Sequence, residues 1–184
     1  MKTCVWASAV LSLGLACGPK SEAPPEAGRK TVEAPAPQAT EPSPKELLTD
    51  DKLRRFALYQ AEINKVAHLA VDAAAQAHQR AGGDQKGFEK ELSKDERIRK
   101  IADAEAAGLS RSGLSRSEAS AIGKLITPYL TNRMMGTEDM KKKARTDFEA
   151  QHGKAALEAA DRHEAELTGL QREMLAAVMK GGRK

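Results

Sequence analysis

The sequence predicts an all-α protein: a small bundle of about four to five helices that follows a disordered segment rich in proline and alanine. After residue 45, Ala, Leu, Glu, Lys, Arg and Gln dominate the composition, and these residues are strong helix formers. Val, Ile and Thr do not occur there in the alternating runs that mark strands. Aromatic residues make up only 3% of the 184 residues, which argues against a β-sandwich and against a protein that stacks nucleic-acid bases on aromatic rings.

Residues 1–16 have the features of a secretory signal peptide. Lys2 supplies a positive charge, and the 14 residues from Thr3 to Ala16 carry none. A membrane-spanning helix needs about 20 apolar residues, so this run is too short to remain as a transmembrane segment. A basic start, a short apolar run and a small residue at its end are typical of a signal peptide that is cleaved.

The residues before Cys17 read Leu-Gly-Leu-Ala and resemble the lipobox of bacterial lipoproteins. In that family a small residue directly precedes a cysteine, whose thiol receives a diacylglyceryl group before cleavage makes it the new N-terminus. The preferred lipobox has Leu three positions before the Cys, where this chain has Gly14. The resemblance implies that Cys17 carries acyl chains such as palmitate. The alternative is an ordinary signal peptide cut after Ala16 or further along the chain, with Cys17 incidental.

The cysteine count agrees with lipidation. The chain has two cysteines, Cys4 and Cys17, so the predicted folded part contains none. This excludes a disulfide, a cysteine nucleophile, a thiolate metal site and an iron–sulfur cluster after residue 17. Gly18 follows the cysteine, where the resemblance would place Asp as an inner-membrane retention signal, so an outer-membrane location in the bacterial cell envelope is favoured.

Residues 17–45 are expected to form a disordered tether. Seven of the eight prolines lie between Pro19 and Pro44, among small and charged residues that have almost nothing to bury. Prolines bias such a segment toward extended polyproline II geometry. Its reach is at most about 85 Å at 3.1 Å per residue, which would hold a body away from the membrane surface.

Residues 46–184 are expected to form the helical domain. The first helix should begin after a cap at Thr49, with Leu48 packing on Leu53, and should end at Gly82. Its alanine-rich second half should allow another helix to approach closely. Ser93 and Glu96 fit a capping box for a second main helix that ends at Gly108, with Phe88 and Leu92 on a short preceding helical turn and a loop over residues 109–114.

Three more helices complete the prediction. Ser115 and Glu118 form another capping box, and Pro128 should kink or divide the helix that follows. Gly136 should end it, Thr137 should cap a fourth helix, and Gly153 should close that one. The fourth helix carries an apolar stripe: Met140, Ala144 and Phe148. The last helix has a heptad-type seam: Ala156, Ala160, His163, Leu167, Leu170, Met174 and Ala177.

No motif for catalysis emerges, so no catalytic, cofactor-binding or metal-binding residue is predicted. Helical metal sites often use Glu-x-x-His pairs from two helices, and this chain has one pair, Glu149 with His152. His163 opens a sequence like H-E-x-x-H but the second His is missing. Because His163 lies on the apolar seam, we interpret it as a packing residue rather than a ligand. The serines between 110 and 120 lack a G-x-S-x-G elbow and include helix caps.

A basic run, Lys141–Lys143 with Arg145, is interpreted as a solvated helix face, or alternatively as a contact for anionic lipid or cell-wall polymer. The leading functional hypothesis is a non-enzymatic envelope lipoprotein whose helical domain binds or scaffolds another envelope component, either a protein or a cell-wall polymer. Nucleic acid is not an expected partner. The alternative is a periplasmic four-helix chaperone or metal-responsive binding protein. Residues 48–51 are similar to the start of the LTxxQ motif of such chaperones, but Lys52 stands where their Gln belongs.

Overall fold

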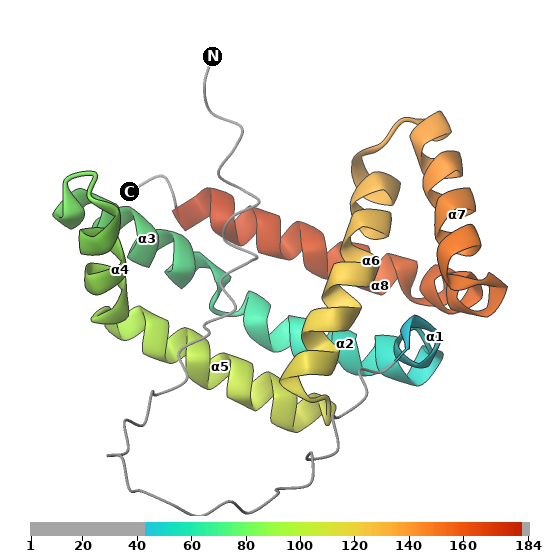
Figure 1. Ribbon diagram of the computed structural model, residues 1–184, viewed down its shortest axis with the longest axis horizontal. Coiled ribbons are helices and arrows are strands. Elements are labelled where there is room, and N and C mark those ends of the chain that lie inside the picture. The colour runs from blue at the N-terminus through green and yellow to red at the C-terminus, as the bar shows by residue number, and fades with distance from the viewer. Residues whose placement is uncertain (1–42, 182–184) are drawn as a thin grey trace, which may run out of the picture. The chain divides into compact units, whose positions relative to one another are not determined.

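The computed structural model describes residues 43–181, and within this range the protein is all-α, as predicted (Figure 1). Contacts divide the chain into two units, Met1–Glu41 and Pro42–Lys184, and every described helix belongs to the second. The described range holds eight helices, more than the four to five expected. They are α1 (Pro44–Leu47), α2 (Asp50–Asn64), α3 (Ala67–Ala81), α4 (Gln85–Ser93), α5 (Glu96–Ser112), α6 (Arg116–Met135), α7 (Glu138–His152) and α8 (Lys154–Gly181).

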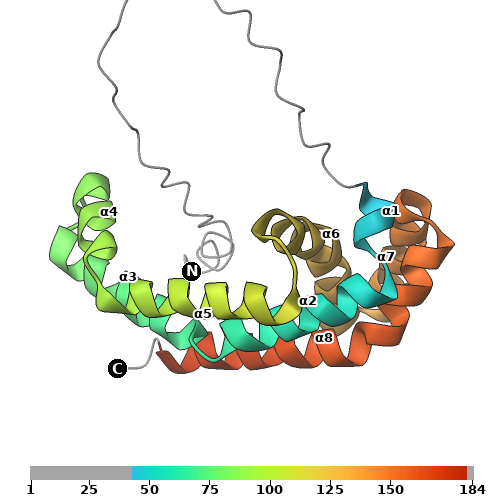
Figure 2. The same cartoon turned by 90° about the horizontal axis from the view of Figure 1, so that it is seen from below.

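Helix α2 is central to this arrangement, because it packs against α5, α6 and α8. Figure 2 shows α5, α2 and α8 running side by side. Toward one end α3 packs against α4, α5 and α8, and toward the other end α6 and α7 pack against each other and against α8. The short helix α1 contacts α6.

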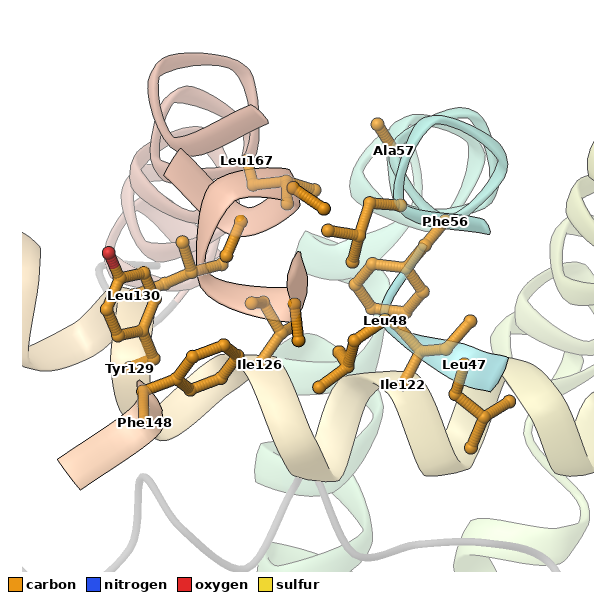
Figure 3. Close-up of a cluster of buried hydrophobic side chains, with 14 of the residues drawn as sticks. Leu47, Leu48, Phe56, Ala57, Ile122, Ile126, Tyr129, Leu130, Phe148 and Leu167 are labelled. Atoms are coloured by element: carbon orange, nitrogen blue, oxygen red, sulfur yellow. The ribbon is translucent and has the colours of Figure 1, made fainter. Parts of the chain in front are cut away.

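The hydrophobic core lies where α1, α2, α6, α7 and α8 meet (Figure 3). Its largest fully buried side chains are Leu48, Leu53, Ile122 and Ile126. Leu48 and Leu53 flank the cap at Thr49, whose hydroxyl accepts a hydrogen bond from the Lys52 amide, so the predicted start of this helix is confirmed. Burial of each such aliphatic side chain contributes about 1.5–3 kcal/mol.

Alanines let the helices at the α3 end approach closely, as expected. Ala73 and Ala77 are buried there, while the larger apolar side chains nearby, such as Leu69 and Phe88, are only half-buried. Helix α4 is a full helix of nine residues rather than the short turn predicted. This end of the domain therefore has a thinner core than the end built on α6.

The first predicted helix is two helices, which corrects the expectation of a single run to Gly82. The break falls at Lys65 and Val66, and Val66 has φ −116° and ψ 2°. The Asn64 side chain donates a hydrogen bond of 2.7 Å to the Leu170 carbonyl of α8 at this point. Val66 is β-branched and loses side-chain freedom in a helix, and the hydrogen bond of Asn64 to α8 favours another backbone conformation. The helix is therefore interrupted here. Gly82 ends α3 in the left-handed conformation.

The boundaries of α5 also differ from the prediction. Asp95, not Ser93, caps it: the Asp95 carboxylate accepts hydrogen bonds from the Arg97 amide and guanidinium, which lower its pKa to about 2. Ser93 is the last residue of α4 and donates to the Lys90 carbonyl. The helix continues past Gly108 to Ser112, where Gly113 caps it in the left-handed conformation.

The later boundaries are largely as predicted. The capping box of Ser115 and Glu118 is present, Thr137 caps α7, and Gly153 closes α7. Pro128 lies inside α6 and does not divide it. The Pro128 side chain is exposed to solvent, so its ring displaces no packed neighbour. The helix loses one backbone hydrogen bond, because proline has no N–H group.

Candidate functional site

The turn between α6 and α7 presents two of the exposed large apolar side chains of the described domain, including the most exposed one, Met135. The Gly136 amide donates to the Asn132 carbonyl at the end of α6, and the Thr137 hydroxyl accepts from the Met140 amide at the start of α7. Figure 1 shows this turn at the upper right, where the two helices join. Met135 is 72% exposed and Met140 is 50% exposed.

The start of α7 lies close to the end of α6 because Gly136 has no side chain. A Cβ atom at Gly136 would lie 2.4 Å from the Asn132 carbonyl oxygen and 3.0 Å from Met140 Cβ. Only glycine therefore allows α7 to begin this close to the end of α6. We call Met135, Gly136 and Met140 the methionine tip. Long, unbranched thioether side chains adapt to different partners, and exposed apolar groups that lie together are typical of interaction surfaces.

Most charged side chains around the methionine tip form ion pairs. Between residues 133 and 147 the chain has five basic and three acidic side chains. Most of the cations are paired, as in Lys141 with Glu138 at 2.8 Å and Lys143 with Asp147 at 2.7 Å. Lys142 is exposed and makes no ion pair with the part of the chain that the structure describes. Lys142 and Lys143 are thus exposed to solvent, whereas Lys141 is only partly exposed.

Polar contacts fix the hairpin of α6 and α7 on α8. The Tyr129 hydroxyl donates to Asp161 at 2.7 Å, and Arg145 pairs with the other oxygen of Asp161 at 2.6 Å. Arg133 pairs with Glu164 at 3.0 Å. Burial, with the carboxylate of Asp161, raises the pKa of Tyr129, so this phenol stays protonated as a donor. These contacts hold the hairpin of α6 and α7, and with it the methionine tip, against α8.

A second feature is a hollow of about 470 Å³ beside the turn between α7 and α8. Apolar side chains such as Leu48 and Ala156 line part of it, and its polar lining includes the basic residues Lys45, Lys154 and Arg162. Its volume and charge suit a small anionic group. Arg162, however, already donates to Asp50 at 2.9 Å, which lies in the same lining. One of the three cations of the hollow is thus already paired within the protein.

His152 also lines this hollow, and the structure gives it a packing role. Its ring meets Phe148 edge-on with centroids 4.7 Å apart, and burial lowers its pKa, so it is neutral near pH 7. Its Nδ1 atom is buried without a hydrogen-bond partner. Glu149 is exposed on the same turn. Within residues 43–181, no group of three or more His, Cys, Asp or Glu residues is placed to hold a metal ion.

His163 lies between two carboxylates rather than in a purely apolar seam. Its Nε2 atom is 3.2 Å from Asp50 and its Nδ1 atom is 3.5 Å from Glu166. The seam itself is divided: Ala156, Ala160 and Leu167 are buried, while Leu170 and Met174 are half-buried. Cys17, the predicted lipidation site, lies outside the described residues.

Sequence reasoning did not identify the methionine tip. It placed Met140 on the apolar stripe with Ala144 and Phe148, but only the latter two are buried. The overlooked signal is Met-Met-Gly at the end of one helix, followed within one turn of the next helix by another Met. Apolar residues on either side of a tight turn between two helices lie at the tip of a hairpin, where neither helix can cover them.

No helix in the described range is both long and apolar enough to cross a membrane. Comparisons with protein-family models, with curated proteins and with solved structures found no match for this chain.

Proposed function

We propose that this protein is a non-enzymatic lipoprotein of the bacterial envelope, whose helical domain uses the methionine tip to bind another envelope component. The observation that carries the proposal is the tip itself: Met135 and Met140 are both exposed on either side of a turn where a Cβ atom at Gly136 would clash with the Asn132 carbonyl. Exposing two large apolar side chains costs solubility and adds nothing to the core. A binding surface accounts for them.

The anchor in this proposal is Cys17, with residues 17–45 as the tether and an outer-membrane location favoured. Each buried acyl CH₂ contributes about 0.8 kcal/mol, so two or more chains hold a protein at a membrane where one does not. Replacing Cys17 with Ser should release the protein to the soluble fraction. A variant that sediments with membranes as fully as the parent would remove the anchor from the proposal.

Site-specific crosslinking tests the binding surface. A photoreactive amino acid is placed at position 140 or at position 58 of the full chain and irradiated in intact cells. Met140 and Leu58 are both 50% exposed, so Leu58 is a matched control outside the tip. We expect a discrete crosslinked product from position 140 and none from position 58. Equal products from the two positions, or none from position 140, would contradict the proposal.

A periplasmic chaperone is the second candidate, and one observation favours it. Leu58, Leu175 and Met179 are also exposed, on α2 and α8 outside the tip. Dispersed apolar exposure suits a protein that holds unfolded clients, whereas a scaffold concentrates its contacts. If Met135→Gln and Met140→Gln together leave suppression of client aggregation unchanged, the dispersed residues carry that activity and the tip does not.

A further inference from the structure

We propose that Met135, Met140 and Met179 are oxidation sites, which peroxides convert to methionine sulfoxide while the fold is preserved. The inference does not rest on the proposed function, because it requires only that these side chains are accessible to a small oxidant. It also identifies Met134 and Met174 as methionines that the fold protects.

Methionine is the residue of the described domain that is most open to oxidation by peroxides. The two cysteines of the chain, Cys4 and Cys17, and its one tryptophan, Trp6, all precede residue 43. All the methionines except Met1 lie within residues 43–181. A peroxide that reaches this domain therefore meets thioethers and neither a thiol nor an indole.

Exposure divides these methionines into two classes. Met135 is 72% exposed, Met179 66% and Met140 50%. Met134 and Met174 are half-buried. An oxidant reaches a side chain through solvent, so the first three should react faster than the other two. Met134 and Met135 are neighbours in the sequence, and it is the fold that distinguishes them.

The three exposed methionines lie at helix ends, where an added oxygen does not enter the core. Met135 is the last residue of α6, Met140 lies in the first turn of α7, and Met179 lies in the last turn of α8. The Met140 amide, rather than its side chain, donates to the Thr137 hydroxyl that caps α7. Oxidation of these side chains therefore leaves the caps and the core in place.

Met174 is different, because its sulfur takes part in a contact between helices. The side-chain amide of Gln60 on α2 donates to the Met174 sulfur on α8, with 3.8 Å between the nitrogen and the sulfur. A sulfoxide is polar and chiral, and it disrupts packing where a flexible apolar side chain fitted before. Protection of Met174 thus preserves the interface between α2 and α8.

Each modification is the transfer of one oxygen atom from hydrogen peroxide. A lone pair of the sulfur attacks one peroxide oxygen, the S–O bond forms and the O–O bond breaks. The other oxygen leaves as water with both protons. The sulfur is oxidised by two electrons and the peroxide is reduced by two, which gives a polar side chain in place of an apolar one.

Peptide mapping measures the reaction at each site. The full chain with Cys4→Ser and Cys17→Ser is treated with excess hydrogen peroxide, quenched at intervals and digested with trypsin. Cleavage after lysine and arginine gives the peptides 134–141 and 173–180, and each contains exposed and half-buried methionines. Tandem mass spectrometry then assigns the oxygen within each peptide. Free methionine in the same mixture gives the rate of a fully accessible thioether.

We expect the three exposed methionines to oxidise at rates close to that of free methionine, and several-fold faster than the two half-buried ones. If Met134 reacts as fast as Met135, or Met174 as fast as Met179, the fold does not protect them and the inference is wrong. Rates at the exposed sites far below that of free methionine would equally contradict it.

Substitution by leucine provides a second arm, because leucine has a similar volume and no sulfur. A variant with Met135→Leu, Met140→Leu and Met179→Leu should lose the fast uptake of oxygen by both peptides. The matched control, with Met134→Leu and Met174→Leu, should retain it. Fast uptake by the first variant would show that the half-buried methionines are the reactive ones.

The claim that the fold is preserved has its own measurement. Circular dichroism after the fast phase should show the same helix content as before. The melting temperature should move by no more than about 3 °C, since changes at exposed side chains have small effects on stability. A larger fall while Met134 and Met174 are still unmodified would show that the exposed methionines support the fold, which would overturn this part of the inference.

Discussion

His163 Nε2 lies 3.2 Å from Asp50 Oδ1 and links the third turn of α8 to the first residue of α2. Arg162 donates to the same carboxylate oxygen at 2.9 Å. The side chain of Asp50 is 57% exposed, whereas that of His163 is 16% exposed. The His163 ring is thus mostly buried, while its Nε2 atom contacts a carboxylate at the surface. His163 therefore serves both as a packing residue and as a polar link between α8 and α2.

His163→Leu is expected to change the free energy of unfolding by no more than about 0.5 kcal/mol, or to raise it slightly. The leucine recovers apolar contact, while Arg162 continues to hold Asp50. Chemical denaturation of parent and variant measures the difference. A loss above about 2 kcal/mol would show that the histidine forms a buried polar contact whose removal leaves a neighbour unsatisfied.

Leu167→Ala should lower the free energy of unfolding by about 2–5 kcal/mol, because this side chain is 2% exposed within the core and its truncation leaves a cavity. Leu170→Ala should cost less, about 1–2 kcal/mol, since Leu170 is only half-buried. Alanine at exposed Glu166 or Arg172 should change stability by about 0.5 kcal/mol or less. Thermal melts of the four variants rank them, and equal effects at Leu167 and Glu166 would contradict the packing of α8.

Capping residues made many boundaries predictable from sequence. The side chains of Thr49, Ser115 and Thr137 all cap the helices expected to follow them, because the signal lies within four residues of the cap. The failure at Ser93 has a physical reason. Asp95, two residues later, binds the Arg97 guanidinium as well as its amide, and this charged contact outcompetes the serine capping box.

The remaining features depend on contacts between distant segments. The break at Val66 coincides with a bond from Asn64 to the Leu170 carbonyl, 106 residues away, which no local pattern reveals. The exposure of Met140 depends on where α6 ends relative to α7. Its spacing from Ala144 and Phe148 correctly indicated a helix, but periodicity does not show which end of a stripe extends beyond the core.

Glu118 should make stability depend on pH in the acid range. Hydrogen bonds from Lys52 and Ser115 lower the pKa of Glu118 to about 2, from 4.5 for an unperturbed glutamate. Because the folded-state pKa is depressed, the stabilisation is present above the unfolded pKa of about 4.5 and is lost as the pH falls toward 2. The side chains of Lys52 and Glu118 are 25% and 22% exposed, so solvent screens the pair only partly.

Glu118→Gln should therefore lower the free energy of unfolding at pH 7 by about 1–2 kcal/mol, and this difference should shrink as the pH falls from 4.5 toward 2. Urea denaturation at a series of pH values measures it. Glu158→Gln is the control, since its contact with Lys154 is 3.8 Å long and exposed and is worth about 0.5 kcal/mol or less. A constant difference between Glu118→Gln and the parent down to pH 2 would show that the carboxylate charge is not what stabilises the junction of α2 and α6.

Gly108 sets the distance between α5 and α2. A Cβ atom at this position would lie 3.1 Å from Tyr59 Cδ2, 3.2 Å from the Tyr59 carbonyl oxygen and 3.4 Å from Glu62 Cβ. The carbonyl belongs to the backbone of α2 and cannot rotate away as a side chain can. To admit a methyl group, α5 and α2 must move apart by a few tenths of an ångström at this contact.

Gly108→Ala should consequently lower the free energy of unfolding by about 1–2 kcal/mol, because overpacking exceeds the gain of about 1 kcal/mol in helix propensity. Gly123→Ala in α6 is the matched control. A Cβ atom there would lie 3.5 Å from the Phe56 ring, an ordinary contact, so the propensity gain should survive and raise stability by up to about 1 kcal/mol. Denaturant titrations should thus give opposite signs for the same chemical change. If both alanines stabilise the protein, α5 has room to move, and the close approach to Tyr59 does not determine how α5 packs on α2.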